Sequence, residues 1–503
     1  MSYPKDLTQT PWAWSLILLV ALTPLAGRAQ VDPSTQPTPD SVDQSTSGSP
    51  QPDQTAPAPA FGAGVTTPSA YENPPISGLD QPSLEPGTVS RSFLAAGAIL
   101  SESGDSNISG TFDSANQSTV GGVTRAMGSI ALQKIWSRSE TDLQYIGGGI
   151  FYEGVPRDTT QIQQADLAQR FRWRTGQFVL RDGLSYLPEG NFGAGSYGGS
   201  GALLSGLAGL GTGTSGLSSG VDDSSGGTLS ANQFGSAGQS PRLTNTAAAD
   251  LVQAINPRST FTMAGSYGFV HFTNNQFGLI DSDQAAAQVG YDRQINRANQ
   301  IAVTYGFQNI HFPQVTGSSL TTNTVHFLYG HRINGRIDFI VAAGPQFTHI
   351  QNPVLGSSTG VSVSGNARLR YRFQRASMEL EYRHYNTNGS GYFLGSITDL
   401  GTVSVSRPLG RVWEANSGIG IANNKRLEST SVVTSATSDR YIFAGAAVHR
   451  HVGRRYRLFL SYQYSRFAFN NTVCLASANC GTSSDRHMGV VGVEWYPRPV
   501  RLD

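Results

Sequence analysis

The sequence is poor in charged residues. They make up 14% of the 503 positions, and apolar residues make up only 38%, whereas soluble globular domains carry about 25% and about 45–50%. Little charge without a matching gain in apolar residues is unusual for a globular enzyme, and it suits a sheet that faces lipid on one side and water on the other. The net charge of +1 provides no basic field for phosphates, so no nucleic-acid partner is expected.

Long apolar runs are also missing. Beyond the N-terminal segment no stretch approaches the roughly 18 consecutive apolar residues of a membrane helix. In that segment Lys5 precedes an apolar core from Trp12 to Leu22, and small residues flank Arg28. This pattern predicts a signal peptide over 1–29, cleaved after Ala29, with an uncleaved anchor as the alternative.

The segment 30–90 has too few apolar residues to fold. It is dense in Pro, Gln, Ser and Thr, so burial cannot offset the loss of chain entropy on ordering. We expect a disordered periplasmic linker, either a passive spacer or an arm that reaches the cell wall.

From residue 91 onward, apolar and polar residues alternate with the period of a β-strand. In one run, Leu458, Leu460 and Tyr462 fall on one face and Arg457 and Ser461 on the other. Eighteen such runs are predicted as strands, with sixteen as the alternative: 91–103, 126–137, 141–152, 163–174, 177–187, 245–255, 259–272, 284–293, 299–312, 322–333, 336–349, 362–374, 377–386, 398–407, 411–422, 439–450, 455–469 and 486–496. These runs are longer than the strands of soluble propellers and sandwiches.

The connections between these runs alternate between short and long. The Asn334-Gly335 turn is a strong hairpin signal, whereas connections such as 350–361 and 188–244 are long. Short periplasmic turns with long external loops are typical of a closed transmembrane β-barrel over 91–503. The Gly-rich loop 188–244 is either a constriction or plug inside the lumen or a flexible external loop.

Tryptophan supports this arrangement independently. Outside the signal segment the chain has Trp136, Trp173, Trp413 and Trp495. Each lies at the short-turn end of a run and shares parity with the apolar face, which predicts an aromatic girdle at the lipid headgroups.

The polar face of the strands is the candidate site. Pore-lining positions are predicted at Arg170, Arg172, Arg368, Arg370, Arg372, Glu379, Glu381, Arg383 and Arg457. The tight turn at 373–377 allows the arginines before it to pair with the carboxylates after it. These charges either bias which solutes pass or brace the wall as ion pairs, and the two roles are compatible.

Cysteine is limited to Cys474 and Cys480. In an exported protein we expect them to form a disulfide within their loop, because two thiols make a poor metal set. No metal site, cofactor or enzymatic activity is expected. Histidines such as His271 and His384 lie near external strand ends, but abundant serine makes any catalytic pairing uninformative.

Together these features resemble the bacterial outer-membrane β-barrels, and the strand number is similar to that of the larger porin-type channels. The resemblance implies an all-β fold in the outer membrane, with membrane lipid and the barrel-assembly machinery as partners. It leaves the subfamily and the oligomeric state open. The expected function is a channel that passes small hydrophilic solutes or exports a polymer through an Arg-lined lumen. The alternative is a non-conducting barrel that presents ligand-binding or adhesive surface loops.

Overall fold

The fold is taken from a computed structural model. It describes residues 92–108, 120–154, 159–187, 241–273, 279–296, 298–315, 317–353, 356–373, 376–387, 393–427, 436–453, 455–474, 480–495, 497–498 and 500–502. The chain divides into two compact units, Met1–Thr55 and Ala56–Asp503. The predicted signal peptide 1–29 and linker 30–90 lie outside the described residues, as does 188–240 of the long loop.

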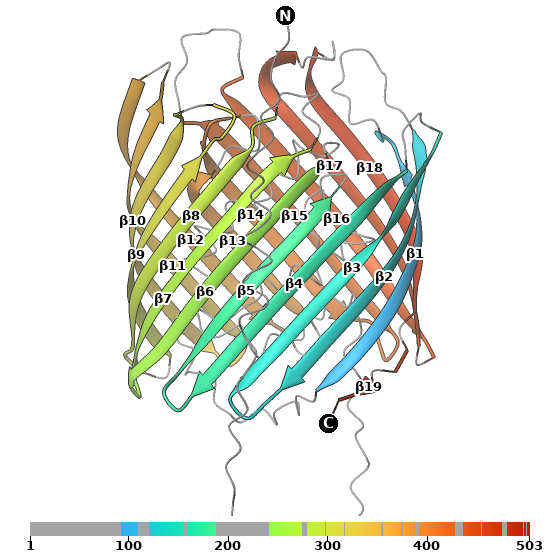
Figure 1. Cartoon of the computed structure of the whole chain (residues 1–503), viewed down its shortest axis with the longest axis horizontal. Coiled ribbons are helices and arrows are strands. Elements are labelled where there is room, and N and C mark those ends of the chain that lie inside the picture. Colours follow the sequence, from blue (N-terminus) through green and yellow to red (C-terminus); the bar gives the residue numbers. More distant parts are fainter. Residues whose placement is uncertain are drawn as a thin grey trace, which may run out of the picture. The chain divides into compact units, whose positions relative to one another are not determined.

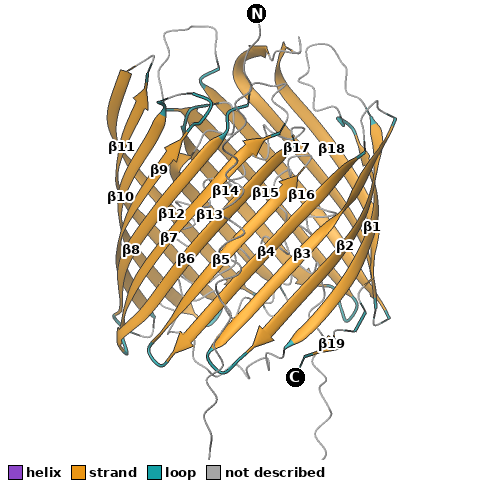
Figure 2. Cartoon of the chain, in the orientation of Figure 1, coloured by secondary structure: helices purple, strands orange, loops and turns teal. Residues whose placement is uncertain are grey.

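The described residues of the second unit form a single antiparallel sheet closed into a barrel of 18 long strands (Figures 1 and 2). Its strands are β1 Phe93–Asp105, β2 Gly121–Ile135, β3 Ser139–Glu153, β4 Thr160–Trp173, β5 Gly176–Leu187, β6 Arg242–Asn256, β7 Ser259–Phe272, β8 Ser282–Gln294, β9 Asn299–His311, β10 Ser319–Asn334, β11 Ile337–Asn352, β12 Gly356–Arg372, β13 Ser377–Thr387, β14 Ser396–Pro408, β15 Trp413–Arg426, β16 Ser438–Val452, β17 Tyr456–Cys474 and β18 Cys480–Trp495.

Each strand pairs with its neighbours in the sequence, and the ring closes between the first and last long strands. On one edge β1 pairs with β2, from Phe93 opposite Gln133 onward. On the other edge β1 pairs with β18, with Ala98 opposite Trp495 and Asp105 opposite Met488. This closure leaves no long strand edge unpaired.

All eighteen predicted runs are strands, so the predicted fold class is confirmed. The largest differences lie at the rim that carries the long loops. The predicted loop 350–361 is mostly strand, because β11 continues to Asn352 and β12 begins at Gly356. Residues 356–361 are exposed, so the start of β12 has no buried face, and alternating hydrophobicity could not reveal it.

The C-terminal residues form a further short strand, β19 Val500–Arg501, at the rim that carries the short turns (Figure 1). It pairs with Phe93 and Leu94 of β1. The backbone N–H of Leu502 donates to the Ser92 carbonyl (3.1 Å), and Lys134 Nζ donates to the Leu502 carbonyl (2.9 Å). The tail thus fastens the start of β1.

Candidate functional site: the inward face of the barrel

Side chains along each strand point alternately outward and inward, and the outward face is apolar whereas the inward face is largely polar. In β9 the exposed side chains are Ile301, Val303 and Tyr305, whereas the alternate residues, which include Gln300 and Thr304, are buried. A strand of 13 residues tilted by about 45° covers roughly 30 Å, the thickness of a bilayer core. The outward face therefore has the height and composition of a lipid-contacting band.

The four tryptophans lie on this outward face at the short-turn rim. Trp136, Trp173, Trp413 and Trp495 are each 40–50% exposed. The indole of Trp173 donates to Gln253 Oε1 (2.9 Å), and the Arg450 guanidinium lies 5.1 Å from the Trp413 ring centroid. This placement is the one predicted for an aromatic girdle, and contact with headgroups stays a prediction.

All nine predicted pore-lining residues lie on the inward face, in the half of the wall nearer the short turns. We call this set, together with the inward Arg181 and the carboxylates that pair with these arginines, the charged zone: Glu140, Arg170, Arg172, Arg181, Asp250, Asp338, Arg368, Arg370, Arg372, Glu379, Glu381, Arg383, Arg457 and Glu494. Asp338, Glu140, Asp250 and Glu494 were not singled out from the sequence. Each shares the parity of its strand's polar face, which is the signal that could have found them.

Most arginines of the charged zone are neutralised by a carboxylate. Arg170 lies 3.2 Å from Glu140 Oε2, and Arg172 binds the same oxygen. Arg181 Nη1 lies 3.1 Å from Asp250 Oδ2. Carboxylates on strands adjacent to those of the arginines, Glu140 and Asp250, therefore hold these guanidinium groups against the wall.

Two further arginines of the charged zone, Arg457 and Arg383, are also neutralised by a carboxylate. Arg457, which is fully buried, binds Glu494 of the next strand. Arg383 Nη2 lies 2.6 Å from Glu381 Oε1. These pairs brace the wall, so they serve the structural role weighed above, and neutral pairs attract solute ions less than free charges do.

One arginine of β12 is not neutralised by a described carboxylate. Arg370 binds Asp338 of β11 through two bonds, from Nε to Oδ1 (3.3 Å) and from Nη2 to Oδ2 (2.8 Å). Arg368 stands opposite Ile340 of β11 and Glu381 of β13, but Glu381 already holds Arg383. Among the described residues, no carboxylate lies within 4.0 Å of the Arg368 guanidinium.

The inward face changes toward the long-loop rim, where hydroxyl and amide side chains form a chain of bonds. Asn386 Nδ2 donates to Thr348 Oγ1 (2.7 Å). Further round the wall, Thr398 Oγ1 donates to Asn424 Oδ1 (2.9 Å), and Asn424 Nδ2 donates to Asp439 Oδ1 (2.6 Å). These side chains are buried, and they bond to one another, although Asn386 Oδ1 has no partner among the described residues.

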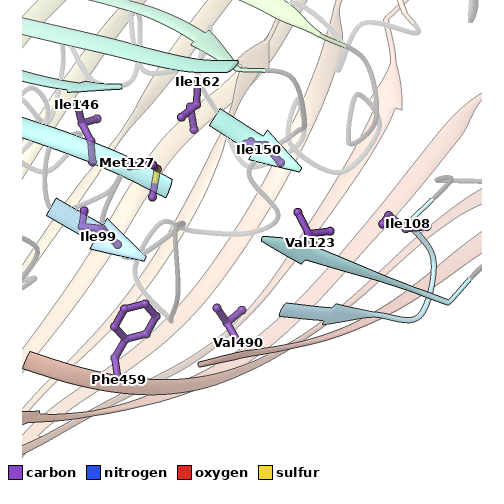
Figure 3. Close-up of a cluster of buried hydrophobic side chains, with 9 residues drawn as sticks. All are labelled: Ile99, Ile108, Val123, Met127, Ile146, Ile150, Ile162, Phe459 and Val490. Carbon is purple, nitrogen blue, oxygen red and sulfur yellow. The ribbon is translucent and has the colours of Figure 1, made fainter. Parts of the chain in front are cut away.

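An apolar cluster, which the sequence analysis did not predict, interrupts the inward face near the seam (Figure 3). It comprises Ile99, Ile108, Val123, Met127, Ile146, Ile150, Ile162, Phe459 and Val490. The run YIGGGIFY in β3 carries apolar residues on both faces, so alternation alone could not assign them. The lumen wall is therefore not uniformly polar.

The remaining predicted features concern cysteine, metals and helices. Cys474 and Cys480 are register partners at the ends of β17 and β18, but their side chains lie outside the described residues, so the disulfide stays a prediction. Within the described ranges, no cluster of three or more candidate ligands could hold a metal ion. Nor does that part of the chain contain a helix long and apolar enough to cross a membrane.

Comparison with known proteins gives structural likeness only. No family model matches the chain, and no curated protein matches it either. Pseudomonas aeruginosa OccK2 (OpdF) is similar at 7% identity and a TM-score of 0.40, over 80% of this chain and 98% of that one. Pseudomonas aeruginosa OpdQ is similar at 9% identity and a TM-score of 0.40, over 82% of this chain and 100% of that one. The ferric-catecholate import receptor Fiu from E. coli K12 is similar at 6% identity and a TM-score of 0.39, over 80% of this chain and 81% of that one. No functional conclusion follows from likeness at this level.

The barrel itself defines the class. A closed antiparallel ring of 18 strands with an exposed apolar outer face and a charged inner zone resembles the bacterial outer-membrane β-barrel proteins, and its size is that of the porin-type members. Neither the fold nor the site resolves a subfamily within this class.

Proposed function

We propose that this chain is a bacterial outer-membrane channel that passes small hydrophilic solutes, acting in passage rather than in catalysis. The observation that carries the proposal is the contrast between the two faces. Exposed Leu, Ile, Val, Tyr and Trp cover the outside, whereas arginines and carboxylates from β3 to β18 meet on the inside. A barrel of this strand number encloses a lumen wide enough for water.

The ion pairs specify what kind of channel this is. Because most inward arginines are neutralised, we expect weak charge selectivity, with a slight preference for anions supplied by Arg368. This refines the Arg-lined lumen expected from the sequence.

A second candidate, a barrel that does not conduct and presents its surface loops to ligands, is favoured by one specific observation. Some inward side chains are fully buried: the exposed fraction is 0% for Arg457 and Asn424 and 1% for Thr260. Side chains that line an open aqueous passage are expected to retain contact with water.

Liposome swelling distinguishes the two candidates. Proteoliposomes that contain the full chain are placed in isotonic arabinose, and a channel predicts swelling that scales with the amount of protein. The matched variant lacks residues 195–240, which lie outside the described residues. If neither protein admits arabinose, the channel proposal is wrong and the loop-presenting barrel is favoured.

A further inference from the structure

The inward faces of β8 and β9 carry a regular row of polar side chains. Across the strand pair, Gln308 stands opposite Ala286, Gln288 opposite Gly306, Thr304 opposite Gly290 and Asp292 opposite Ala302. We call this row, which Gln284 and Gln300 complete at its two ends, the amide ladder. A polar group thus recurs about every 6.8 Å along nearly the full height of the wall, alternating between the two strands.

Small residues stand opposite the four middle rungs and keep this part of the ladder close to its neighbours. A Cβ atom on Gly290 would lie 2.7 Å from Thr262 Oγ1 and 2.9 Å from Thr304 Cγ2, and one on Gly306 would lie 2.9 Å from Thr324 Oγ1. Glycine at these two positions therefore lets threonine hydroxyls of β7 and β10 approach the ladder. Around these two glycines the surface therefore consists of amides and hydroxyls, whereas apolar side chains flank other parts of the row: Ile310 stands opposite Gln284, and Leu328 stands opposite Ala302.

Several rungs have unmet hydrogen-bonding capacity. Gln284 lacks a partner for both Oε1 and Nε2, Gln288 lacks one for Oε1, and Gln300 lacks one for Nε2. All three side chains are more than nine-tenths buried. A buried amide atom without a partner costs free energy, and native structures retain such atoms chiefly where water or a ligand binds them. Such atoms occur elsewhere in the wall as well, and this row is distinguished by their regular spacing on one strand pair.

We infer that the amide ladder binds a neutral oligosaccharide that lies along the wall. A sugar hydroxyl both donates and accepts, so it can satisfy the two free atoms of Gln284 together. An extended peptide would need pockets for its alternating side chains, which Ala286, Ala302 and the two glycines do not provide. The Asp292 carboxylate within the row disfavours an acidic polymer. The inference rests on the proposed passage of hydrophilic solutes and names their class.

The test is binding of maltohexaose to the full chain in detergent, measured by isothermal titration calorimetry. The ladder variant is Gln284→Leu with Gln288→Leu, which removes the amides at similar volume. The matched control is Gln346→Leu. Gln346 is a buried inward glutamine in the same row of register partners as Gln288, since Gln288 stands opposite Gly306, Gly306 opposite Thr324 and Thr324 opposite Gln346.

We expect the unaltered chain to bind maltohexaose saturably and the control to bind it equally well. The ladder variant should bind at least fivefold more weakly, because each lost hydrogen bond contributes about 0.5–1.5 kcal/mol. No binding to the unaltered chain, or equal losses in both variants, would overturn the inference. A polar peptide that binds where maltohexaose does not would do the same. Calorimetry does not depend on conductance, so failure of the ladder and failure of the channel are separable: swelling without binding removes only the ladder.

Discussion

Asp105 of the first strand and Arg486 of the last long strand form a buried ion pair across the seam where the barrel closes. Arg486 Nε donates to Asp105 Oδ2 (2.7 Å), although 381 residues separate the two in the sequence. Beside them, Asn107 Nδ2 donates to Ser484 Oγ (3.0 Å). At the opposite rim, β19 and Lys134 fasten the start of β1, so the seam is held at both ends.

Removing one partner of this pair leaves the other charge buried. We predict that Arg486→Ala lowers the free energy of unfolding by about 3–5 kcal/mol, measured by urea titration in lipid vesicles. The control is Arg466→Ala on the neighbouring strand. Arg466 Nε lies 3.9 Å from Asp485 Oδ1, and both side chains are about half exposed. Its loss should cost less than about 1 kcal/mol. Equal losses would show that the pair does not hold the seam.

The arginines of β12 should differ in their effects on charge selectivity. Arg368→Ser removes a guanidinium that no described carboxylate neutralises, so preference for anions should fall. Asp338→Asn releases Arg370 from its two bonds, so preference for anions should rise. Each change in permeability ratio should be about two- to sixfold, since a unit charge acting over 4–8 Å of water contributes about 0.5–1 kcal/mol. Reversal potentials in a KCl gradient report the ratio, and a shift toward cations in Asp338→Asn would contradict this assignment.

The four outward tryptophans should report headgroup depth. In vesicles, fluorescence of a chain that lacks residues 1–29 should be quenched more by a spin label near the lipid headgroup than by one at the chain terminus. The comparison variant adds Leu460→Trp. Leu460 is 64% exposed and lies between the two rims on β17, so the added signal should show the opposite depth preference. Equal quenching at both depths would argue against the girdle.

Gly420 of β15 leaves room for an inward aromatic ring. It stands opposite Phe443 of β16, and a Cβ atom there would overlap the phenyl ring. Gly420→Ala should therefore destabilise the barrel by about 1–3 kcal/mol, and Phe443→Leu in the same chain should restore most of the loss. Gly489→Ala is the control, because its Cβ would meet nothing within 4 Å. A neutral result for Gly420→Ala in urea titrations would show that the ring moves freely.

The sequence predicted the strands well because alternation over ten or more residues leaves little ambiguity. It also predicted the inward direction of Arg368, Arg370 and Glu381, since direction follows from parity. It left the choice between partners open. The register places Arg370 opposite Glu379, as expected, yet Arg370 also stands opposite Asp338, and the described bonds go to that carboxylate. Each residue of a closed sheet has two neighbours, and side-chain rotamers decide between them.

Single-channel recording in a planar bilayer is the most direct test of the central claim, which is that the charged inner wall lines an aqueous passage. We expect stable conductance from the refolded full chain, with a weak anion preference that disappears in Arg368→Ser. Persistent silence, both in the full chain and after deletion of residues 195–240, would contradict it.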